Sequence, residues 1–442
     1  MNDTAGRLEK LVQQVLGRPL PLRLRAWDGS QAGPPQGPTL VLRDRRALHR
    51  LIWKPGELGL ARAWVAGEID IEGDLYEALD RLSGIVWDHD EPERGRFPVL
   101  RRLAALRDPR NLRLAAEILA LAGSAVPPPP PPEEAARYRG PLHSLRRDGR
   151  AISHHYDVGN DFYSLVLGPS MVYSCAYWEC PEATLEDAQR AKLDLVCCKL
   201  GLRPGMRLLD VGCGWGSMVL HATEHYGVEA VGVTISQEQA TFARKRLAEA
   251  GLTDRVDIRI QDYREIEDGP YDAISSIGMA EHVGSIQFRA YADILHSLLK
   301  PGGRLLNHQI ARRPLKDETA YEIDEFIDRY VFPDGELAPV GTTTALLEDA
   351  GFEVRDVEAL REHYALTLRA WVSNLEQQWS QAVRLTTAGR ARVWRLYMAA
   401  SALAFEQNSI GVNQILAVRT TREGNADMPR TRSNWLNTIS AD

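Results

Sequence analysis

MRLLDVGCGWGS, residues 206–217, is the stretch around which the rest of the chain is organised. A short apolar run, Leu208 and Leu209, ends at Asp210, and an apolar helical pattern begins just after residue 217. Between them three glycines stand at alternate positions: Gly212, Gly214 and Gly216. This order predicts a buried parallel strand, a tight glycine turn and the start of a helix. Glycine is favoured where the backbone passes close to a ligand, so the turn indicates a binding site.

The composition is that of a globular protein without a membrane span. The chain has 442 residues, 44% of them hydrophobic and 26% charged, which allows two or three domains. It contains neither a run of about 18 apolar residues nor a signal-peptide core, so we expect a cytoplasmic protein. A net charge of −7 gives no signature of nucleic-acid binding. The five cysteines, all between Cys175 and Cys213, lack zinc-ligand spacing, so we expect reduced thiols and no metal.

Residues 1–122 are predicted to form a small α+β domain that associates with lipid or membrane. Strands are expected at 21–25, 39–42 and 68–71, and a helix over 45–52. Six consecutive prolines then predict an extended, semi-rigid spacer. The other predicted segments are a proline-rich linker at 123–140, a catalytic domain at 141–425 and a polar tail at 426–442.

Residues 94–113 carry seven arginines and one aspartate, with leucines at roughly helical spacing. Such a stretch can be a solvated helix face, and it can also lie on an anionic membrane surface. The second interpretation places the protein peripherally on the inner face of the cell membrane. Arg146, Arg147 and Arg150 would then also contact lipid phosphates.

Strand-like and helix-like patterns alternate from residue 185 onward. Helices are expected over 185–202 and 237–250, and strands at 229–233, 256–260, 271–277 and 303–310. This alternation predicts a doubly wound parallel α/β sheet, with its ligand at the carboxyl ends of the strands. Residues 311–335 are expected to help cap a substrate pocket, and strands that return to the sheet are expected within 365–420.

Polar and aromatic side chains follow the successive strands of this predicted sheet. Thr234, Ser236 and Gln239 could bind ribose oxygens. Asp262 could accept a hydrogen bond from an adenine amino group, and Tyr263 could stack on the ring. The glycines lack the dinucleotide spacing G-x-G-x-x-G, and there is no phosphate-binding loop. An adenosine ligand without a pyrophosphate is therefore favoured, which points to S-adenosylmethionine.

Seven motifs together resemble the cyclopropane-fatty-acid synthases and their mycolic-acid-modifying relatives. They are HHYDVGNDFY (154–163), MVYSCAYW (171–178), LLDVGCGWG (208–216), GVTISQEQ (232–239), SIGMAEHVG (276–284), FIDRYVFPDGEL (326–337) and HYALTLRAW (363–371). The resemblance implies a class I methyltransferase fold with a Rossmann-like sheet and a helical cap over an acyl pocket. The stretch 53–71 also resembles the additional N-terminal domain of the longer members.

The resemblance also implies a set of site residues. A bicarbonate ion would act as the base, held by Cys175, Glu281, His308, Tyr364 and the backbone of Ile310. S-adenosylmethionine would be bound by Tyr173, Ser174, Asp210, Gly212, Gly214, Gly216, Thr234, Ser236, Gln239, Asp262, Tyr263 and Ile277. The substrate would be the cis double bond of an unsaturated acyl chain, usually one carried by a membrane phospholipid.

This chemistry makes physical sense of the residue types. An alkene is a weak nucleophile, so the sulfonium methyl must be held in line with it. Methyl transfer leaves a carbocation, which aromatic faces can stabilise once water is excluded. Cys175, His308 and Tyr364 can donate hydrogen bonds to a bound base, and Glu281 can accept one. Taken singly, each also has a structural interpretation: a buried cysteine is usually a small core hydrophobe.

Two products and two other functions stay open at this stage. Proton loss with ring closure gives a cyclopropane, whereas a hydride shift first gives a methylene-branched chain, which would need a separate reductase partner. Ala280 stands where the family usually has phenylalanine, which could widen the pocket and change the product. The other functions are methylation of a soluble acceptor and a lipid-binding role without catalysis. A homodimer is compatible with the sequence.

Overall fold

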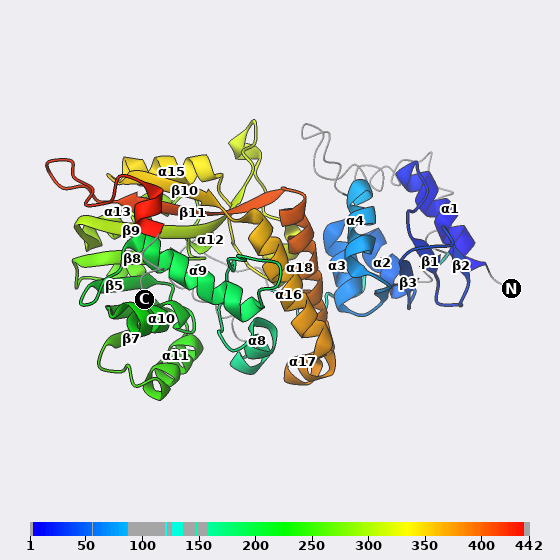
Figure 1. Ribbon diagram of the computed structural model, residues 1–442. Coiled ribbons are helices and arrows are strands. Elements are labelled where there is room, and N and C mark those ends of the chain that lie inside the picture. The colour runs from blue at the N-terminus through cyan, green and yellow to red at the C-terminus, as the bar shows by residue number, and fades with distance from the viewer. Residues whose placement is uncertain are drawn as a thin grey trace. The chain divides into compact units, whose positions relative to one another are not determined.

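The structure, a computed structural model, describes residues 3–54, 56–86, 120–121, 126–135, 147 and 158–436 (Figure 1). The chain divides into two compact units. The first comprises Met1–Ala136, Asp324–Val331 and Thr386–Leu403, and the second comprises Arg137–Ile323, Phe332–Leu385 and Ala404–Asp442. Two segments that the sequence placed in the catalytic domain, 324–331 and 386–403, are therefore grouped with the N-terminal unit.

The first unit is built on a small four-stranded sheet flanked by helices, as the predicted α+β class requires. Its strand order is β2 (Gln31–Ala32), β1 (Arg23–Arg25), β3 (Thr39–Leu42) and β4 (Ile69–Glu72). Its helices are α1 (Thr4–Leu16), α2 (Arg46–Trp53), α3 (Glu57–Val65), α4 (Leu75–Val86), α14 (Glu325–Tyr330) and most of α18 (Ala388–Glu406). The predicted basic stretch 94–113, with Arg146 and Arg150, lies outside the described residues.

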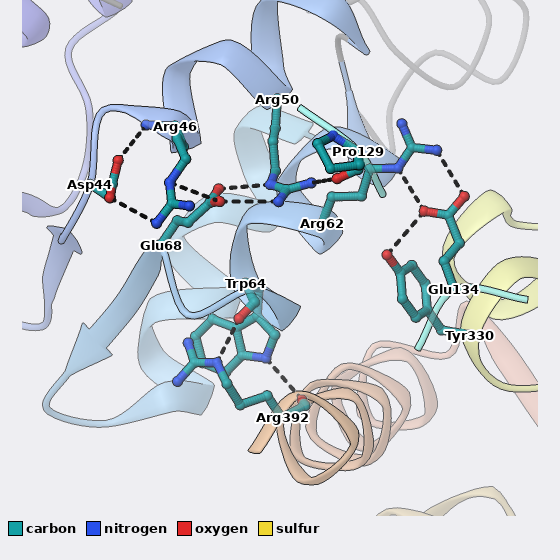
Figure 2. Close-up of polar contacts among 10 residues, drawn as sticks. All are labelled: Asp44, Arg46, Arg50, Arg62, Trp64, Glu68, Pro129, Glu134, Tyr330 and Arg392. Atoms are coloured by element: carbon teal, nitrogen blue, oxygen red, sulfur yellow. Dashed lines mark hydrogen bonds and ion pairs between the residues drawn. The ribbon is translucent and has the colours of Figure 1, made fainter. Parts of the chain in front are cut away.

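Buried ion pairs connect the first unit to the proline-rich segment (Figure 2). Arg50 pairs with Glu68, and the two side chains are 7% and 3% exposed. The Arg50 guanidinium also donates to the Pro129 carbonyl at 2.9 Å. Arg62 donates to both carboxylate oxygens of Glu134, at 2.6 and 2.8 Å. The described part of the proline segment is therefore held against this unit by side-chain contacts, and its role as a spacer stays a prediction.

Within the same unit, Trp64 contacts the part of α18 that belongs to it. The indole Nε1 of Trp64 donates to the Arg392 carbonyl at 2.8 Å, and Arg392 Nε donates back to the Trp64 carbonyl at 2.5 Å (Figure 2). The Arg392 guanidinium also lies over the Trp64 ring, 4.3 Å from its centroid. A cation over an indole face is attracted by the ring quadrupole. Local sequence pattern could not predict this pairing of distant segments.

The second unit is built on a seven-stranded sheet. Its order is β10 (Glu353–Ala359), β11 (Ile410–Val418), β9 (Leu299–Arg312), β8 (Tyr271–Ile277), β5 (Arg207–Val211), β6 (Glu229–Thr234) and β7 (Val256–Ile260). Neighbours from β9 to β7 are parallel, whereas β11 is antiparallel to both β9 and β10. The predicted class I fold is confirmed, but the sheet is mixed and not wholly parallel as the alternation predicted, because β11 returns antiparallel between β9 and β10. Strand β10 precedes the region 365–420, where returning strands were expected.

Helices cover both faces of this sheet, because alternate residues of each strand carry apolar side chains to opposite sides. Leu208 belongs to the cluster formed with α9 (Leu185–Leu200), α10 (Ser217–Tyr226) and α11 (Gln237–Glu249). Leu209 belongs to the cluster formed with α13 (Phe288–Leu298) and α15 (Val340–Asp349). Helix α9 begins with a capping box between Thr184 and Asp187, and ends at Gly201 in the left-handed conformation.

Further helices and 3₁₀ turns complete the second unit. They are α8 (Asn160–Leu167), α12 (Ala280–Val283), α16 (Arg361–Gln377), α17 (Trp379–Leu385), α19 (Arg432–Leu436) and the 3₁₀ turns η3 (Tyr263–Glu265) and η4 (Glu318–Ala320). Within the described parts of the chain, no helix combines the length and apolarity needed to cross a membrane.

Glu134 should be a main source of stability in the first unit. Its side chain is 1% exposed and pairs with both Arg62 and Arg329. Glu134→Ala leaves two guanidinium groups without this partner, so we expect the free energy of unfolding to fall by about 3–5 kcal/mol. Glu77→Ala, which removes an exposed pair with Arg81, should cost less than about 1 kcal/mol. Urea denaturation of the full chain measures both, and equal losses would contradict the assignment.

Candidate active site

A cavity lies at the carboxyl ends of β5, β6, β7 and β8, where the loops after these strands meet. Ten of the predicted cofactor contacts line it: Tyr173, Ser174, Asp210, Gly212, Gly214, Thr234, Gln239, Asp262, Tyr263 and Ile277. The two others have structural tasks nearby. Gly216 precedes α10 with φ of 80°, and the Ser236 hydroxyl caps α11 by accepting from the Gln239 amide at 3.3 Å. Their contact with a cofactor stays a prediction.

The glycine turn shapes the wall of this cavity. Gly212 has φ of 78°, and a Cβ at this position would lie 2.4 Å from the side chain of Met279. Gly214 has φ of 54°, and a Cβ there would meet no described protein atom within 4 Å. Gly212 is thus required for packing against the loop after β8, whereas Gly214 leaves its backbone open to the cavity.

Two buried groups of opposite charge face the cavity. The Asp210 carboxylate accepts from Ser275 Oγ at 2.6 Å, and burial raises its pKa to about 6. Lys192 Nζ donates to Ser174 Oγ at 3.0 Å, and burial lowers the pKa of this lysine to about 8. Such a pair suits a zwitterionic amino-acid group, because each charge on the ligand would find a partner of opposite sign.

Lys192 was not among the site residues predicted from the sequence. The helical spacing could have indicated that this lysine lies on the buried face of the helix, because Lys192 stands four residues after Ala188 and four before Val196, both of which are buried. A lysine on the apolar face of a predicted helix is rarely buried without a specific partner. Further cavity residues that were not predicted include Gln261, Arg264, Met279 and His282.

The predicted adenine contacts are already ordered by neighbouring side chains. Arg264 Nε donates to Asp262 Oδ1 at 2.7 Å, and Arg264 Nη2 donates to Oδ2 at 2.8 Å. The Arg264 guanidinium also lies over the Tyr263 ring, 5.2 Å from its centroid. The ring of Tyr263 is further held edge-on by Tyr291 at 5.0 Å. Asp262 and Tyr263 therefore present a preformed polar and aromatic edge to the cavity.

The predicted base-binding residues are linked by the backbone of Leu360. Its carbonyl accepts from Cys175 Sγ at 3.6 Å and from the Tyr364 amide at 3.1 Å. Its own amide donates to the Val412 carbonyl at 2.9 Å, and Val412 pairs with Ile310 between β11 and β9.

Ile310 in turn holds Glu281, because its amide donates to Glu281 Oε1 at 2.7 Å. The Ile310 amide was one candidate contact for a bound anion, and it is already used by this bond. In the structure, Ile310 acts by orienting the Glu281 carboxylate. Burial raises the pKa of this carboxyl to about 7.

Three buried polar atoms near this linkage have no hydrogen-bond partner among the described residues. They are Glu281 Oε2 and both ring nitrogens of His308. Burial, together with the positive charges of Lys192 and Lys199, keeps the pKa of His308 well below its usual range. Buried polar atoms without partners are rare in native proteins and call for an explanation. A small oxyanion that both accepts from a ring N–H and donates to a carboxylate, such as bicarbonate, fits these atoms.

An aromatic series extends from the cavity to Tyr364. Successive ring centroids lie 4.7 Å apart for Trp215 and Tyr163, 5.7 Å for Tyr163 and Tyr173, 5.4 Å for Tyr173 and Trp371, and 6.1 Å for Trp371 and Tyr364. Ring faces attract positive charge, so this series can stabilise a cation formed between the two groups of residues. Of the HHYDVGNDFY motif that supplies Tyr163, residues 154–157 lie outside the described residues.

Comparisons with known proteins identify the family to which this sequence is similar. Residues 143–415 match the family model described as mycolic acid cyclopropane synthetase. A probable fatty acid methyltransferase of Mycobacterium tuberculosis is 43% identical over 416 residues, covering 92% of this chain and 93% of that protein. The cyclopropane-fatty-acyl-phospholipid synthase of Escherichia coli is 37% identical over 283 residues, covering 64% of this chain and 71% of that protein.

Two solved structures resemble this chain in fold and extend the comparison. Mycolic acid cyclopropane synthase CmaA1, complexed with S-adenosylhomocysteine (SAH) and CTAB, has a TM-score of 0.58 at 34% identity, covering 61% of this chain and 97% of that chain. The cyclopropane synthase MmaA2 from Mycobacterium tuberculosis also has a TM-score of 0.58, at 32% identity, covering 63% of this chain and 99% of that chain.

Gly214 offers a matched test of the cavity. Gly214→Ala and Gly251→Ala each place a side chain at a positive φ where no described atom lies within 4 Å, but only Gly214 lines the cavity. Both should cost about 1 kcal/mol of stability. Only Gly214→Ala should weaken binding of SAH, by about tenfold or 1.4 kcal/mol, as measured by titration calorimetry. Equal affinities in the two variants would show that the cavity is not the SAH site.

Glu281 should make stability depend on pH. Its pKa is raised from 4.5 to about 7, so the folded chain keeps a proton that the unfolded chain releases. The wild-type protein therefore loses stability as the pH rises through this window, with a loss of about 3 kcal/mol. Glu281→Gln removes that loss, so its stability relative to wild type should rise from pH 4.5 to pH 8. Surface Glu224→Gln is the control. The assignment would be refuted if the urea midpoints of Glu281→Gln and of the wild-type protein changed equally between the two pH values.

Proposed function

The chain belongs to the mycolic acid cyclopropane synthetase family, whose members modify fatty acids as S-adenosylmethionine-dependent methyltransferases, and we propose that its substrate is an unsaturated phospholipid acyl chain. In this proposal a methyl carbon is added to the cis double bond of a chain held in a membrane. The observation that carries the proposal is the set of Cys175, Glu281, His308 and Tyr364, in which Glu281 Oε2 and both His308 ring nitrogens are buried without a partner among the described residues. Cys175 and Glu281 directly follow and precede the cavity residues Ser174 and His282. A methyltransferase for a soluble phenol or amine has no evident need for such a set.

The reaction balances without an external oxidant. The sulfur–methyl bond of the cofactor breaks as a new bond forms to one alkene carbon, which leaves SAH and a carbocation on the neighbouring carbon. Loss of one proton from the transferred methyl group, with ring closure, gives the cyclopropane. The aromatic series from Trp215 to Tyr364 would favour the cation, and its burial would keep out water that would otherwise trap the cation as an alcohol.

The proton needs a base in an apolar surrounding. Bicarbonate, when bound, would supply a weak base of suitable size. Glu281 Oε2 would accept from its hydroxyl, and a ring N–H of His308 would donate to one of its oxygens. Tyr364 would offer a further donor. Cys175 already donates to the carbonyls of Ala176 and Leu360, at 3.2 and 3.6 Å, so its contribution would be to the shape of the pocket.

The product can be a cyclopropane or a methylene-branched chain. A hydride shift before proton loss moves the cation and yields the branched alkene, which a separate reductase would then saturate. The smaller residue at Ala280 was the sequence feature that raised this question. Ala280 is buried in the apolar cluster on the α13 face of the sheet, together with Phe288. Its position supports an effect on core packing more directly than an effect on the width of the cofactor cavity.

Association with a membrane surface would bring the enzyme to its substrate. The basic stretch 94–113 supports this part of the proposal by its sequence alone. Arg147 is less suited to contact lipid phosphates than we expected, because its Nε and Nη2 donate to the two carboxylate oxygens of Asp334, both at 2.6 Å. Its guanidinium therefore already has a bidentate anionic partner.

Lipid analysis tests the proposed substrate. Cells that express the chain and are grown with oleate should gain phospholipids whose monounsaturated acyl chains are heavier by 14 mass units, the mass of one CH₂ group. Cells that express Gly214→Ala should show a much smaller gain, because cofactor binding is weakened. Mild hydrogenation separates the products, since it adds two hydrogens to a methylene branch and none to a ring. If the protein binds SAH but the acyl chains gain no mass, the methyl acceptor is a soluble compound and not a phospholipid acyl chain.

A further inference from the structure

One row of side chains crosses four strands of the large sheet. Glu358 on β10 pairs with Gln414 on β11, Gln414 pairs with His308 on β9, and His308 pairs with Ile277 on β8. Cross-strand partners point to the same face of a sheet, with their Cβ atoms about 4.5–5.5 Å apart in antiparallel pairs. The row therefore extends from a partly exposed carboxylate to Ile277 at the cofactor cavity.

Lys199 on α9 lies against the outer half of this row. Its side chain is 1% exposed and pairs with Glu358 and, at 3.6 Å, with Asp356. Its Nζ also donates to Gln414 Oε1 at 2.8 Å. The lysine is thus neutralised from one side and hydrogen-bonded to a fully buried glutamine on the other.

This lysine determines which way the glutamine amide faces. An ammonium group has three donors and no acceptor, so only the amide oxygen of Gln414 can face Lys199. The amide NH₂ must then face away from the lysine. In the structure Gln414 Nε2 is buried and has no hydrogen-bond partner among the described residues, and the same is true of both ring nitrogens of the adjacent His308.

We propose that Lys199 and Gln414 set the tautomer of His308. The structure shows no hydrogen bond between these two cross-strand neighbours, and the proposal includes its formation. The amide NH₂ can only donate, so the imidazole nitrogen that pairs with it must carry the lone pair and accept. The proton of a neutral imidazole then resides on the opposite nitrogen, which becomes a fixed donor inside the site. The partner of one ring nitrogen commonly decides the role of the other in this way. Lys199 and Gln414 are positioning residues, since they act through His308.

The same arrangement keeps the imidazole neutral. An imidazolium would direct a second N–H at the Gln414 NH₂ group, and its positive charge would add to those of Lys192 and Lys199 on α9. The other titratable groups of the site are the carboxyl group of Glu281 and the thiol of Cys175. The consequence for catalysis rests on the proposed function: a donor of fixed orientation would hold the oxygen of a bound base during proton transfer.

Nitrogen-15 NMR of the imidazoles measures the tautomer directly and does not depend on activity. The full chain, labelled with ¹⁵N-histidine, has 11 imidazoles to resolve, and the signals lost in His308→Gln identify those of His308. At neutral pH we expect one protonated and one unprotonated ring nitrogen, in a single tautomer. If the wild-type protein shows an imidazolium, or a nearly equal mixture of the two tautomers, the proposal is overturned without any variant.

Gln414→Glu reverses the demand on the imidazole. A carboxylate still accepts from Lys199 but now offers an acceptor to His308, so the nearer ring nitrogen must carry a proton and the tautomer should invert. The matched control is Gln309→Glu. Gln309 is also a buried glutamine and lies next to His308 on β9, but its side chain bonds to Asn307 and Thr343. The control should leave the His308 signals unchanged, and an unchanged tautomer in Gln414→Glu would overturn the proposal.

Kinetics then separate this inference from the proposed function. If the proposed role of His308 holds, kcat for vesicles of unsaturated phospholipid should fall about tenfold or more in Gln414→Glu, with little change in KM for the cofactor. Inversion of the tautomer without loss of kcat would confirm the Lys199–Gln414 device and refute the role of His308 in the reaction. A loss of kcat without inversion would refute the device.

Discussion

Two buried lysines on one helix are the constraint on which the rest of the second unit depends. Lys192 and Lys199 stand two turns apart on α9, each 1% exposed and facing the large sheet. A charge removed from water is tolerated only when partners compensate it. Lys192 bonds to Ser174 at the cofactor cavity, and Lys199 bonds to Glu358 and Gln414. The polar residues of the sheet are therefore arranged around this helix, and with them both halves of the site.

The two halves of the site follow from the topology of the sheet. Parallel strands bring their carboxyl ends to one edge, which collects the glycine turn, Asp210 and the loops that line the cofactor cavity. The antiparallel strand β11 then lies beside β9, so that Val412 and Gln414 stand next to Ile310 and His308. One end of this pairing orients Glu281, and the other reaches Lys199. Methyl transfer and proton removal can thus be served by adjoining parts of one sheet.

The sequence predicted the parts of this arrangement that depend on local pattern. The strand before Asp210, the glycine turn and the alternation of helices and strands to residue 310 all follow from periodicity, and the motifs of the family located ten residues of the cavity. Local pattern could not predict which strands pair across long separations. It therefore missed β10, the row through Gln414, and the grouping of 324–331 and 386–403 with the first unit. From the sequence alone, lysines on a helix are expected to be exposed to solvent, whereas the two lysines of α9 lie on its buried face.

We propose that the chain transfers a carbon from S-adenosylmethionine to the double bond of a phospholipid acyl chain. The most direct measurement is carbon-13 NMR of vesicles of unsaturated phospholipid after incubation with the purified protein and cofactor labelled at its methyl carbon. We expect the label to appear on an acyl-chain carbon, as a ring methylene or as a terminal alkene carbon. Label that stays on the cofactor, or that appears on a head-group nitrogen, would contradict it.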